Sequence, residues 1–140
     1  MRAMFTKNRK IELLKSVPLF SGCSKKELAH IARIADEIDF KPGKTLIREG
    51  ALGREFFVLA EGTAEITRKG KKIDEARAGD FFGEMALLAD RPRNATVTTT
   101  SDVDALVVSS TSFRDLIEVN PLIALKVMRA VADRLPPDAF

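Results

Sequence analysis

One stretch of the sequence, Phe81–Val97, gathers residue types that can hold an anion and a sugar. Gly83 has no Cβ, so a phosphate can approach the backbone closely at that point. The free N–H groups at the start of a short helix, together with the helix dipole, would attract the same anion. Arg93 follows the turn at Pro92 and can pair with a phosphate through two parallel hydrogen bonds. The carboxylate of Glu84 would repel a phosphate and is better suited to accept a hydrogen bond from a ribose 2′-hydroxyl.

Each of these residues also has a purely structural interpretation. Gly83 can end a strand, because glycine tolerates unusual backbone angles. Glu84 is favourable in the first turn of a helix, and Arg93 can be an ordinary surface charge. Taken singly, each residue is more often structural. Their combination at this spacing favours a site for one phosphate and one ribose.

The N-terminal elements that would support this stretch are two helices. Residues 6–15 form an amphipathic pattern with Ile11 and Leu14 facing inward, which we expect Pro18 to end. Ser24 and Glu27 fit a capping box, so a second helix should begin there. One face of this second helix carries Leu28, Ile31, Ala32 and Ala35. His30 falls beside that face and is interpreted as a surface or rim residue.

From about residue 37 the pattern changes to short apolar runs separated by glycine-containing turns. A turn about every eight to twelve residues predicts a small all-β sandwich or barrel. Residues 56–59 are continuously apolar, which is typical of a buried strand, and residues 63–67 alternate, as in a strand with one wet face. Residues 68–72 predict the tip of a hairpin. Its four charges indicate a solvated turn rather than a nucleic-acid patch, because no aromatic residues interleave with them.

Helical signals return at the end of the chain. Residues 112–119 predict a short helix, and Asn120 with Pro121 fits an N-cap followed by the first helical position. The last helix should run to about residue 135. It is apolar on two sides, through Leu122, Leu125, Ala132 and Leu135 on one and Ile123, Val127 and Val131 on the other. Such a helix must be covered on both sides, by the β region and, for example, by a second copy of the same helix.

Composition limits the function classes. The 140 residues suit one domain, and the net charge of +3, interpreted as spread along the chain, gives little support for nucleic-acid binding. A single cysteine allows no internal disulfide and favours a reducing, cytoplasmic location. No apolar run is long enough to span a membrane. The only histidine, His30, is far from any nucleophile motif, so we expect neither a metal centre nor catalysis.

Two segments carry a resemblance to a known family. Phe82–Leu88, with the sequence FGEMALL, and Pro92–Val97, with the sequence PRNATV, resemble the phosphate-binding cassette of cyclic nucleotide-binding domains. That family includes the bacterial catabolite activator protein, regulatory subunits of cyclic-AMP-dependent protein kinase, and cyclic-nucleotide-gated channels. Val17–Phe20 resembles the family's entry segment, and Val119–Pro121 resembles the start of its last helix. The glycine-punctuated pattern of residues 42–62 resembles the family's β-roll.

The resemblance implies a mainly β fold with flanking helices, in which a double-stranded β-helix, or jelly roll, forms the β-roll. One domain is expected over residues 1–140. Its expected parts are N-terminal helices in 1–36, the β-roll in 37–110 with a cassette and its short helix in 81–97, and the C-terminal B and C helices in 111–135.

The resemblance also implies roles for individual residues. Backbone donors would come from the segment around Gly83 and Ala86, Glu84 would bind the ribose 2′-hydroxyl, and Arg93 would neutralise the cyclic phosphate. The residues expected at the ligand are Phe82, Gly83, Glu84, Met85, Ala86, Arg93, Asn94 and Ala95, with Ile66, Ile73 and Ala76 as an apolar wall beside the purine. Arg134 is expected either to face the base or to form a surface salt bridge.

The expected function is a non-catalytic sensor of a 3′,5′-cyclic nucleotide, with cAMP preferred over cGMP and no cofactor. The amide of Asn94 can donate or accept, so it does not distinguish the two bases. Signalling would pass through movement of the C-terminal helices to an effector protein or to a homodimer formed by the last helix. Direct DNA binding is not expected, because only five residues follow Leu135. The alternative is an interaction or dimerisation module with a vestigial pocket.

Overall fold

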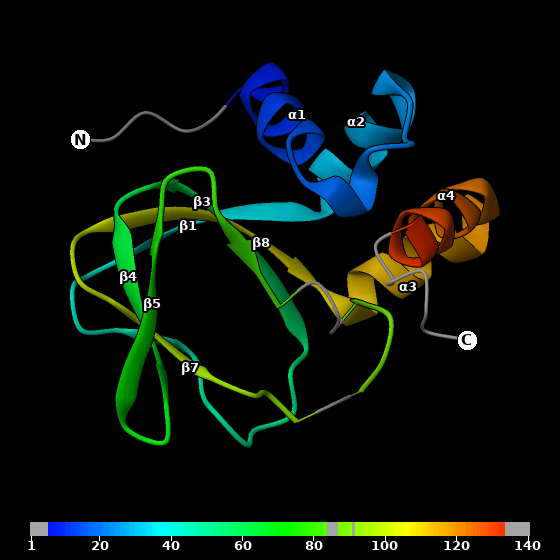
Figure 1. Ribbon diagram of the computed structural model, residues 1–140. Helices are drawn as coiled ribbons and strands as arrows, with labels where there is room; N and C mark the ends of the chain where they lie inside the picture. The colour runs from blue at the N-terminus through cyan, green and yellow to red at the C-terminus, as the bar shows by residue number, and fades with distance from the viewer. Residues whose placement is uncertain (1–5, 84–86, 91, 134–140) are drawn as a thin grey trace.

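The computed structural model describes residues 6–83, 87–90 and 92–133, and its elements follow the order helices, strands, helices (Figure 1). The N-terminal helical elements are α1 (Lys7–Lys15), η1 (Pro18–Phe20) and α2 (Lys25–Ile34). The strands are β1 (Ala35–Phe40), β2 (Thr45–Ile47), β3 (Glu55–Glu61), β4 (Thr63–Arg68), β5 (Lys71–Arg77), β6 (Phe81–Phe82), β7 (Thr96–Thr99) and β8 (Val103–Ser109). The C-terminal helices are α3 (Ser110–Val119) and α4 (Pro121–Asp133).

The strands form two four-stranded antiparallel sheets, with the orders β1-β8-β3-β6 and β2-β7-β4-β5. Strands β3 and β8 are the central pair of the first sheet, with Phe57 opposite Val107 and Val58 opposite Leu106. In the second sheet β4 and β5 form a hairpin, as predicted. Its turn residues Lys69 and Gly70 both have positive φ, which is the geometry of a tight two-residue hairpin turn. The predicted mainly β fold with flanking helices is confirmed.

The middle of strand β3, residues 56–60, is continuously apolar because it separates two cores. Phe56 and Val58 point to a core shared with the helices, whereas Phe57 and Leu59 point to a core between the two sheets. Alternate side chains of a strand face opposite ways, so a strand buried on both faces needs an unbroken apolar run. Burial on both faces of β3 therefore explains the apolar run, residues 56–59, from which a buried strand was predicted.

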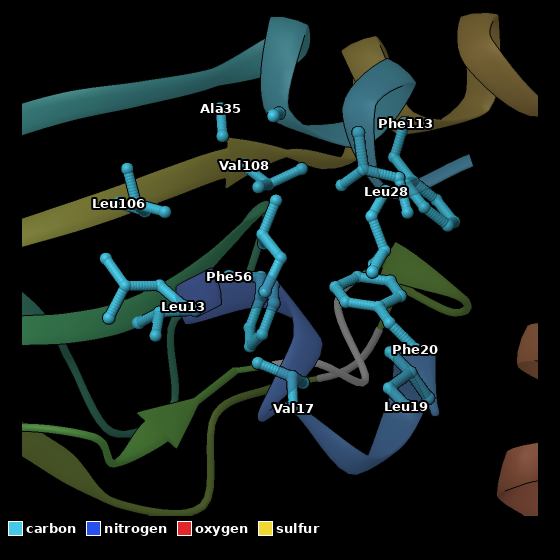
Figure 2. Packing of buried hydrophobic residues seen from close by; sticks show 14 of the residues in the cluster. Leu13, Val17, Leu19, Phe20, Leu28, Ala35, Phe56, Leu106, Val108 and Phe113 are labelled. Carbon is cyan, nitrogen blue, oxygen red and sulfur yellow. The ribbon is translucent and has the colours of Figure 1, made fainter. Parts of the chain in front are cut away.

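The helical core covers the outer face of the first sheet, and the helices gather at one end of the roll (Figure 1). Phe20 of η1 packs in this core (Figure 2), with its ring 5.9 Å from that of Phe56 and 6.3 Å from that of Phe113 in α3. Leu87, which belongs to the candidate stretch 81–97, is 2% exposed and packs in the same core. The stretch is thus tied to the helices by apolar packing.

The predicted capping box at the start of α2 is confirmed. The Glu27 N–H donates to the Ser24 Oγ at 3.1 Å, and the Ser24 N–H donates to the Glu27 Oε1 at 2.7 Å. The same Oε1 accepts a hydrogen bond from the Nζ of Lys126 in α4 at 2.5 Å, so one carboxylate joins two helices. Lys126 and then the Ser24 N–H hold the pKa of Glu27 below its usual range. Burial raises the pKa of the neighbouring Cys23 thiol to about 11.

Of three local predictions at helix ends, the one that placed Ala35 in the second helix is wrong. Ala35 does not continue α2 but begins β1, where it lies opposite Val108, so pairing with β8 replaces the last helical turn. The helix predicted over residues 6–15 is confirmed as α1, which ends at Lys15, and Pro18 begins η1. Helix α4 begins at Pro121, as predicted, but the Asn120 N–H and Nδ2 both donate to the Leu116 carbonyl oxygen, at 2.9 and 3.4 Å, so the Asn120 side chain closes α3.

Helix α4 is covered on only one side by the residues that the structure describes. Ile123, Val127 and Ala130 are buried against the helical core. On the other side Leu122 is 53% exposed and Met128 61% exposed. The second cover that we expected is therefore not supplied by the described part of the chain, and Leu135 lies outside it.

No described helix has both the length and the apolar character that crossing a membrane would require. Within the same residues, no three His, Cys, Asp or Glu side chains gather as a group that could hold a metal ion.

Candidate functional site

Gly83 follows strand β6 and has a backbone conformation that suits glycine. Its φ is +84°, in the left-handed region that side chains disfavour. A Cβ at this position would lie 2.8 Å from the carbonyl oxygen of Glu55 and 2.7 Å from the Nη1 of Arg93. Both the backbone angle and the crowding therefore require a residue without a side chain.

The backbone of Arg93 is fixed by the loop that precedes β3. The Arg93 N–H donates to the Ala51 carbonyl oxygen at 2.8 Å, and the Gly50 N–H donates to the Arg93 carbonyl oxygen at 2.8 Å. Pro92, directly before it, forms an antiparallel bridge with Leu52. These contacts set the point from which the Arg93 side chain extends.

The guanidinium of Arg93 crosses from this loop to Gly83. Its Nη2 donates to the Glu55 carbonyl oxygen at 2.5 Å, and its Nη1 is 3.4 Å from the Gly83 carbonyl oxygen. A Cβ on Gly53 would lie 2.1 Å from the Arg93 Nε, so the arginine side chain passes directly against this buried glycine. Two glycines and two carbonyl groups thus shape a channel for one cationic side chain.

Arg93 lies at the edge of a cavity of about 530 Å³, bounded by the β4–β5 hairpin and by residues of the 81–97 stretch. This volume is within the range of small-molecule sites. The lining residues are Ile47, Ile66, Arg68, Ile73, Asp74, Phe82, Gly83, Ala89, Pro92, Arg93, Asn94, Ala95 and Val97. Two arginines and several apolar side chains along the wall suit a ligand with an anionic group and a flat apolar body.

The cavity brings together seven of the residues that the sequence proposed. These are Phe82, Gly83, Arg93, Asn94 and Ala95, with Ile66 and Ile73 on the hairpin. Ala76 does not line the cavity, because it is 2% exposed and packs in the core between the sheets. Glu84, Met85, Ala86 and Arg134 lie outside the described residues, as does part of the expected cassette helix.

Two charged residues of the cavity wall were not singled out from the sequence. The Nε of Arg68 donates to the Asn94 carbonyl oxygen at 2.9 Å, which ties the hairpin to the residue after Arg93. The Oδ1 of Asp74 accepts from the Glu75 N–H at 2.8 Å. Arg68 could have been identified by the alternation along β4, because it has the same parity as Ile66. Because Arg68 stands among the other charges of the hairpin tip, this alternation was not recognised.

Asn94 and Ala95 contribute to the wall in different ways. Asn94 is exposed and its carbonyl is already engaged by Arg68, whereas Ala95 is 8% exposed. Among the described lining residues there is no serine, cysteine or histidine.

Comparison with known proteins gives the same picture. The model of the family described as "Cyclic nucleotide-binding domain" matches residues 37–120. The chain is 39% identical to a cAMP-dependent protein kinase regulatory subunit of Aspergillus fumigatus over 120 residues, which cover 84% of this chain and 29% of that protein. It is 35% identical to a protein of the same description from Hypocrea atroviridis, covering 84% and 26%. The chain thus spans under a third of the length of these relatives.

Solved structures share the fold. The N-terminal domain of a transcriptional regulator from Streptomyces coelicolor has a TM-score of 0.81 and 27% identity, covering 87% of this chain and 91% of that one. The regulatory domain of Toxoplasma gondii PKA, crystallised with cAMP, has a TM-score of 0.70 and 28% identity, covering 88% and 50%. The expected β-roll is thereby confirmed. Since the family model matches more than half of its residues, the chain belongs to the cyclic nucleotide-binding domain family.

Proposed function

We propose that the cavity beside Arg93 binds a 3′,5′-cyclic nucleotide and that cAMP is preferred over cGMP. The observation that carries the proposal is the channel in which Gly53 and Gly83 hold the Arg93 guanidinium at the edge of a 530 Å³ cavity. A ligand phosphate would replace neutral carbonyl acceptors with a charged one, which makes stronger hydrogen bonds. The preference for cAMP is supported by the relatives, which are described as cAMP-dependent, and by the Toxoplasma gondii domain crystallised with cAMP.

The remaining expected residues act around this phosphate site. The segment Phe82–Ala86 and the N–H groups of Asn94 and Ala95 would donate to the phosphate, and Glu84 would accept from the ribose 2′-hydroxyl. Ile66 and Ile73 would cover the purine, and Arg134 would face the base. Ile73 is 48% exposed, so a bound base would remove apolar surface from water. We propose no part for Ala76, since it is buried in the core.

Binding would be transmitted to the C-terminal helices through two contacts. Leu87 packs in the helical core with Phe113 of α3, and the Nη2 of Arg114 in α3 donates to the Oδ1 of Asp90 at 3.1 Å. A phosphate that draws the cassette toward Arg93 would displace both contacts. The chain would then shift toward a state with α3 and α4 repacked, as a single sensor unit over residues 1–140.

We propose that this sensor is not an enzyme and that it signals to an effector protein or through formation of a homodimer. The exposed apolar side of α4 supports an interaction role, and it also supports the alternative of a docking module with a vestigial pocket. Direct DNA binding is not part of the proposal.

Titration calorimetry of the folded chain with cAMP, cGMP and 5′-AMP tests these statements. We expect saturable heat with cAMP, weaker binding of cGMP and much weaker binding of 5′-AMP, with cAMP recovered unchanged afterwards. Absence of heat with all three nucleotides would favour the vestigial pocket. Amide exchange of α3 and α4 with and without cAMP tests the movement, and unchanged protection of both helices would refute it.

A further inference from the structure

The positive charge of this chain is concentrated in its N-terminal helices, contrary to the even spread expected from composition. Residues 1–33 contain eight of the 23 Lys and Arg residues and only two of the 20 Asp and Glu residues. One of those two acids, Glu27, is already paired with Lys126 of α4. The N-terminal segment therefore carries a net positive charge while the rest of the chain is net negative.

Much of this charge lines a groove of about 440 Å³ on the α1–α2 pair, whose two helices pack against each other. Lys7 of α1 and Lys25, Lys26 and Arg33 of α2 are exposed around the groove, and no carboxylate is among its described lining residues. None of these four cations has an ion pair in the part of the chain that the structure describes. Four unpaired like charges around one groove repel each other and favour an anionic occupant.

Three of these lysines stand where a helix disfavours them. Lys7 is the first residue of α1, and Lys25 and Lys26 are the first two of α2. The dipole of a helix makes cations unfavourable in its first turn, where acids are preferred. Local helix stability therefore does not explain these lysines.

The groove is not only charged. Its inner surface includes the buried Ile11 and the half-buried Ala29, so a small apolar side chain can enter between the cations. Lys26 and His30 also line an adjoining groove that reaches the exposed Val119 and Leu122. Apart from His30, no aromatic side chain lines either groove within the described residues, so neither offers the row of aromatic rings typical of single-stranded nucleic-acid sites.

We propose that the groove between α1 and α2 binds an acidic peptide segment of a partner protein, with carboxylates on the lysines and apolar side chains over Ile11 and Ala29. A concave surface with an apolar floor matches alternating acidic and apolar side chains better than it matches a flat membrane surface. This surface is separate from the nucleotide cavity, and the proposal does not depend on nucleotide binding.

The test uses the complete 140-residue chain and a fluorescein-labelled peptide of four Glu-Glu-Leu repeats, followed by fluorescence anisotropy. The matched uncharged probe has four Gln-Gln-Leu repeats. We expect saturable binding of the acidic peptide that weakens as salt rises, because salt screens exposed charges, and no binding of the uncharged one. Equal binding of the two peptides would refute the proposal.

Charge reversal locates the site. The Lys25→Glu/Lys26→Glu double variant should bind the acidic peptide at least about tenfold more weakly. It should fold as well as the parent, since acids suit the first turn of a helix. The control is Lys71→Glu/Lys72→Glu at the exposed hairpin tip, which changes net charge equally and should bind within about twofold of the parent.

An equal loss in both double variants would show that only net charge matters, and would overturn the assignment. A duplex DNA or a vesicle containing phosphatidylserine that binds more tightly than the peptide, and loses binding in Lys25→Glu/Lys26→Glu, would assign the groove to that partner instead.

Discussion

The Arg93 end of the proposed nucleotide cavity and its hairpin end are held by different kinds of interaction. At the Arg93 end, backbone hydrogen bonds from Gly50 and to Ala51 fix the arginine, and Gly53 and Gly83 leave room only for its guanidinium. At the hairpin end, Ile73 is half exposed and Arg68 makes one hydrogen bond from an exposed strand end. The first end is fixed by the fold, and the second rests on side chains of one hairpin.

This difference matches the proposed ligand. All cyclic nucleotides carry the same phosphate, so the group that binds it can be rigid and the same for each of them. The bases differ, and side chains on a hairpin with a two-residue turn can be substituted without disturbing the core. We therefore expect substitutions at the Arg93 end to abolish binding and substitutions at the hairpin end to adjust it.

The largest effect is expected from Arg93→Ala. Removing the guanidinium leaves a desolvated phosphate without its partner, which should cost about 2–5 kcal/mol of cyclic nucleotide binding. The measurement is calorimetry with cAMP. The matched control is Arg68→Ala, an arginine on the wall of the same cavity, for which we expect a loss below about 1 kcal/mol. Similar losses of cAMP affinity in Arg93→Ala and Arg68→Ala would show that the two ends of the cavity do not differ in this way.

A smaller effect is expected from Gly53→Ala. The added Cβ would overlap the Arg93 side chain, which must then leave its channel, and cAMP affinity should fall about tenfold, or 1.4 kcal/mol. Because the arginine can move, the melting temperature should change little. Gly22→Ala, whose Cβ would make only ordinary contact with Lys126 at 3.7 Å, serves as the control. Unchanged affinity in Gly53→Ala would show that the arginine acts without this channel.

The hairpin end is tested by Ile73→Ala. The side chain is 48% exposed in the ligand-free chain, so its loss should hardly change the free energy of unfolding. A base that covers it would lose apolar contact worth about 0.5–1.5 kcal/mol. Calorimetry with cAMP and cGMP, beside urea unfolding, separates the two effects. A loss of stability without any loss of affinity would contradict a role for Ile73 in covering the base.

The smallest effect is expected for the Glu27–Lys126 ion pair. This pair lies outside both ends of the cavity, so its effect on stability serves as a reference for the other variants. Since the pKa of Glu27 is lowered in the folded chain, its contribution to stability is present above its unfolded pKa and is lost as pH falls through the folded pKa. Lys126→Met should therefore make the acid-induced loss of stability shallower. Urea unfolding between neutral and acidic pH measures this, and identical pH profiles would contradict it.

The sequence predicted features that depend on neighbouring residues. The capping box of Ser24 and Glu27 and the hairpin tip at 68–72 are confirmed, because caps and tight turns are decided within a few residues. Family membership and the β-roll could be inferred because Phe82–Leu88 and Pro92–Val97 keep a specific motif.

Features that depend on distant residues were missed or wrong. Ala35 joins β1 because β8 lies beside it, which no local pattern reveals. The part that Gly53 plays in shaping the channel was not predicted, since it is 40 positions from Arg93. The contacts of Glu84 with a ribose and of Arg134 with a base stay predictions.

The Glu27 carboxylate has a further consequence for how two ligands would communicate. It caps α2 beside Lys26 in the basic groove, and it is also the partner of Lys126 in α4. If cyclic nucleotide moves α4, Glu27 loses its counter-charge and lowers the positive potential of the groove. Thermodynamic reciprocity then requires an acidic peptide in the groove to weaken nucleotide binding by the same factor. A single side chain would thus make the two binding events antagonistic, although their sites share no residue.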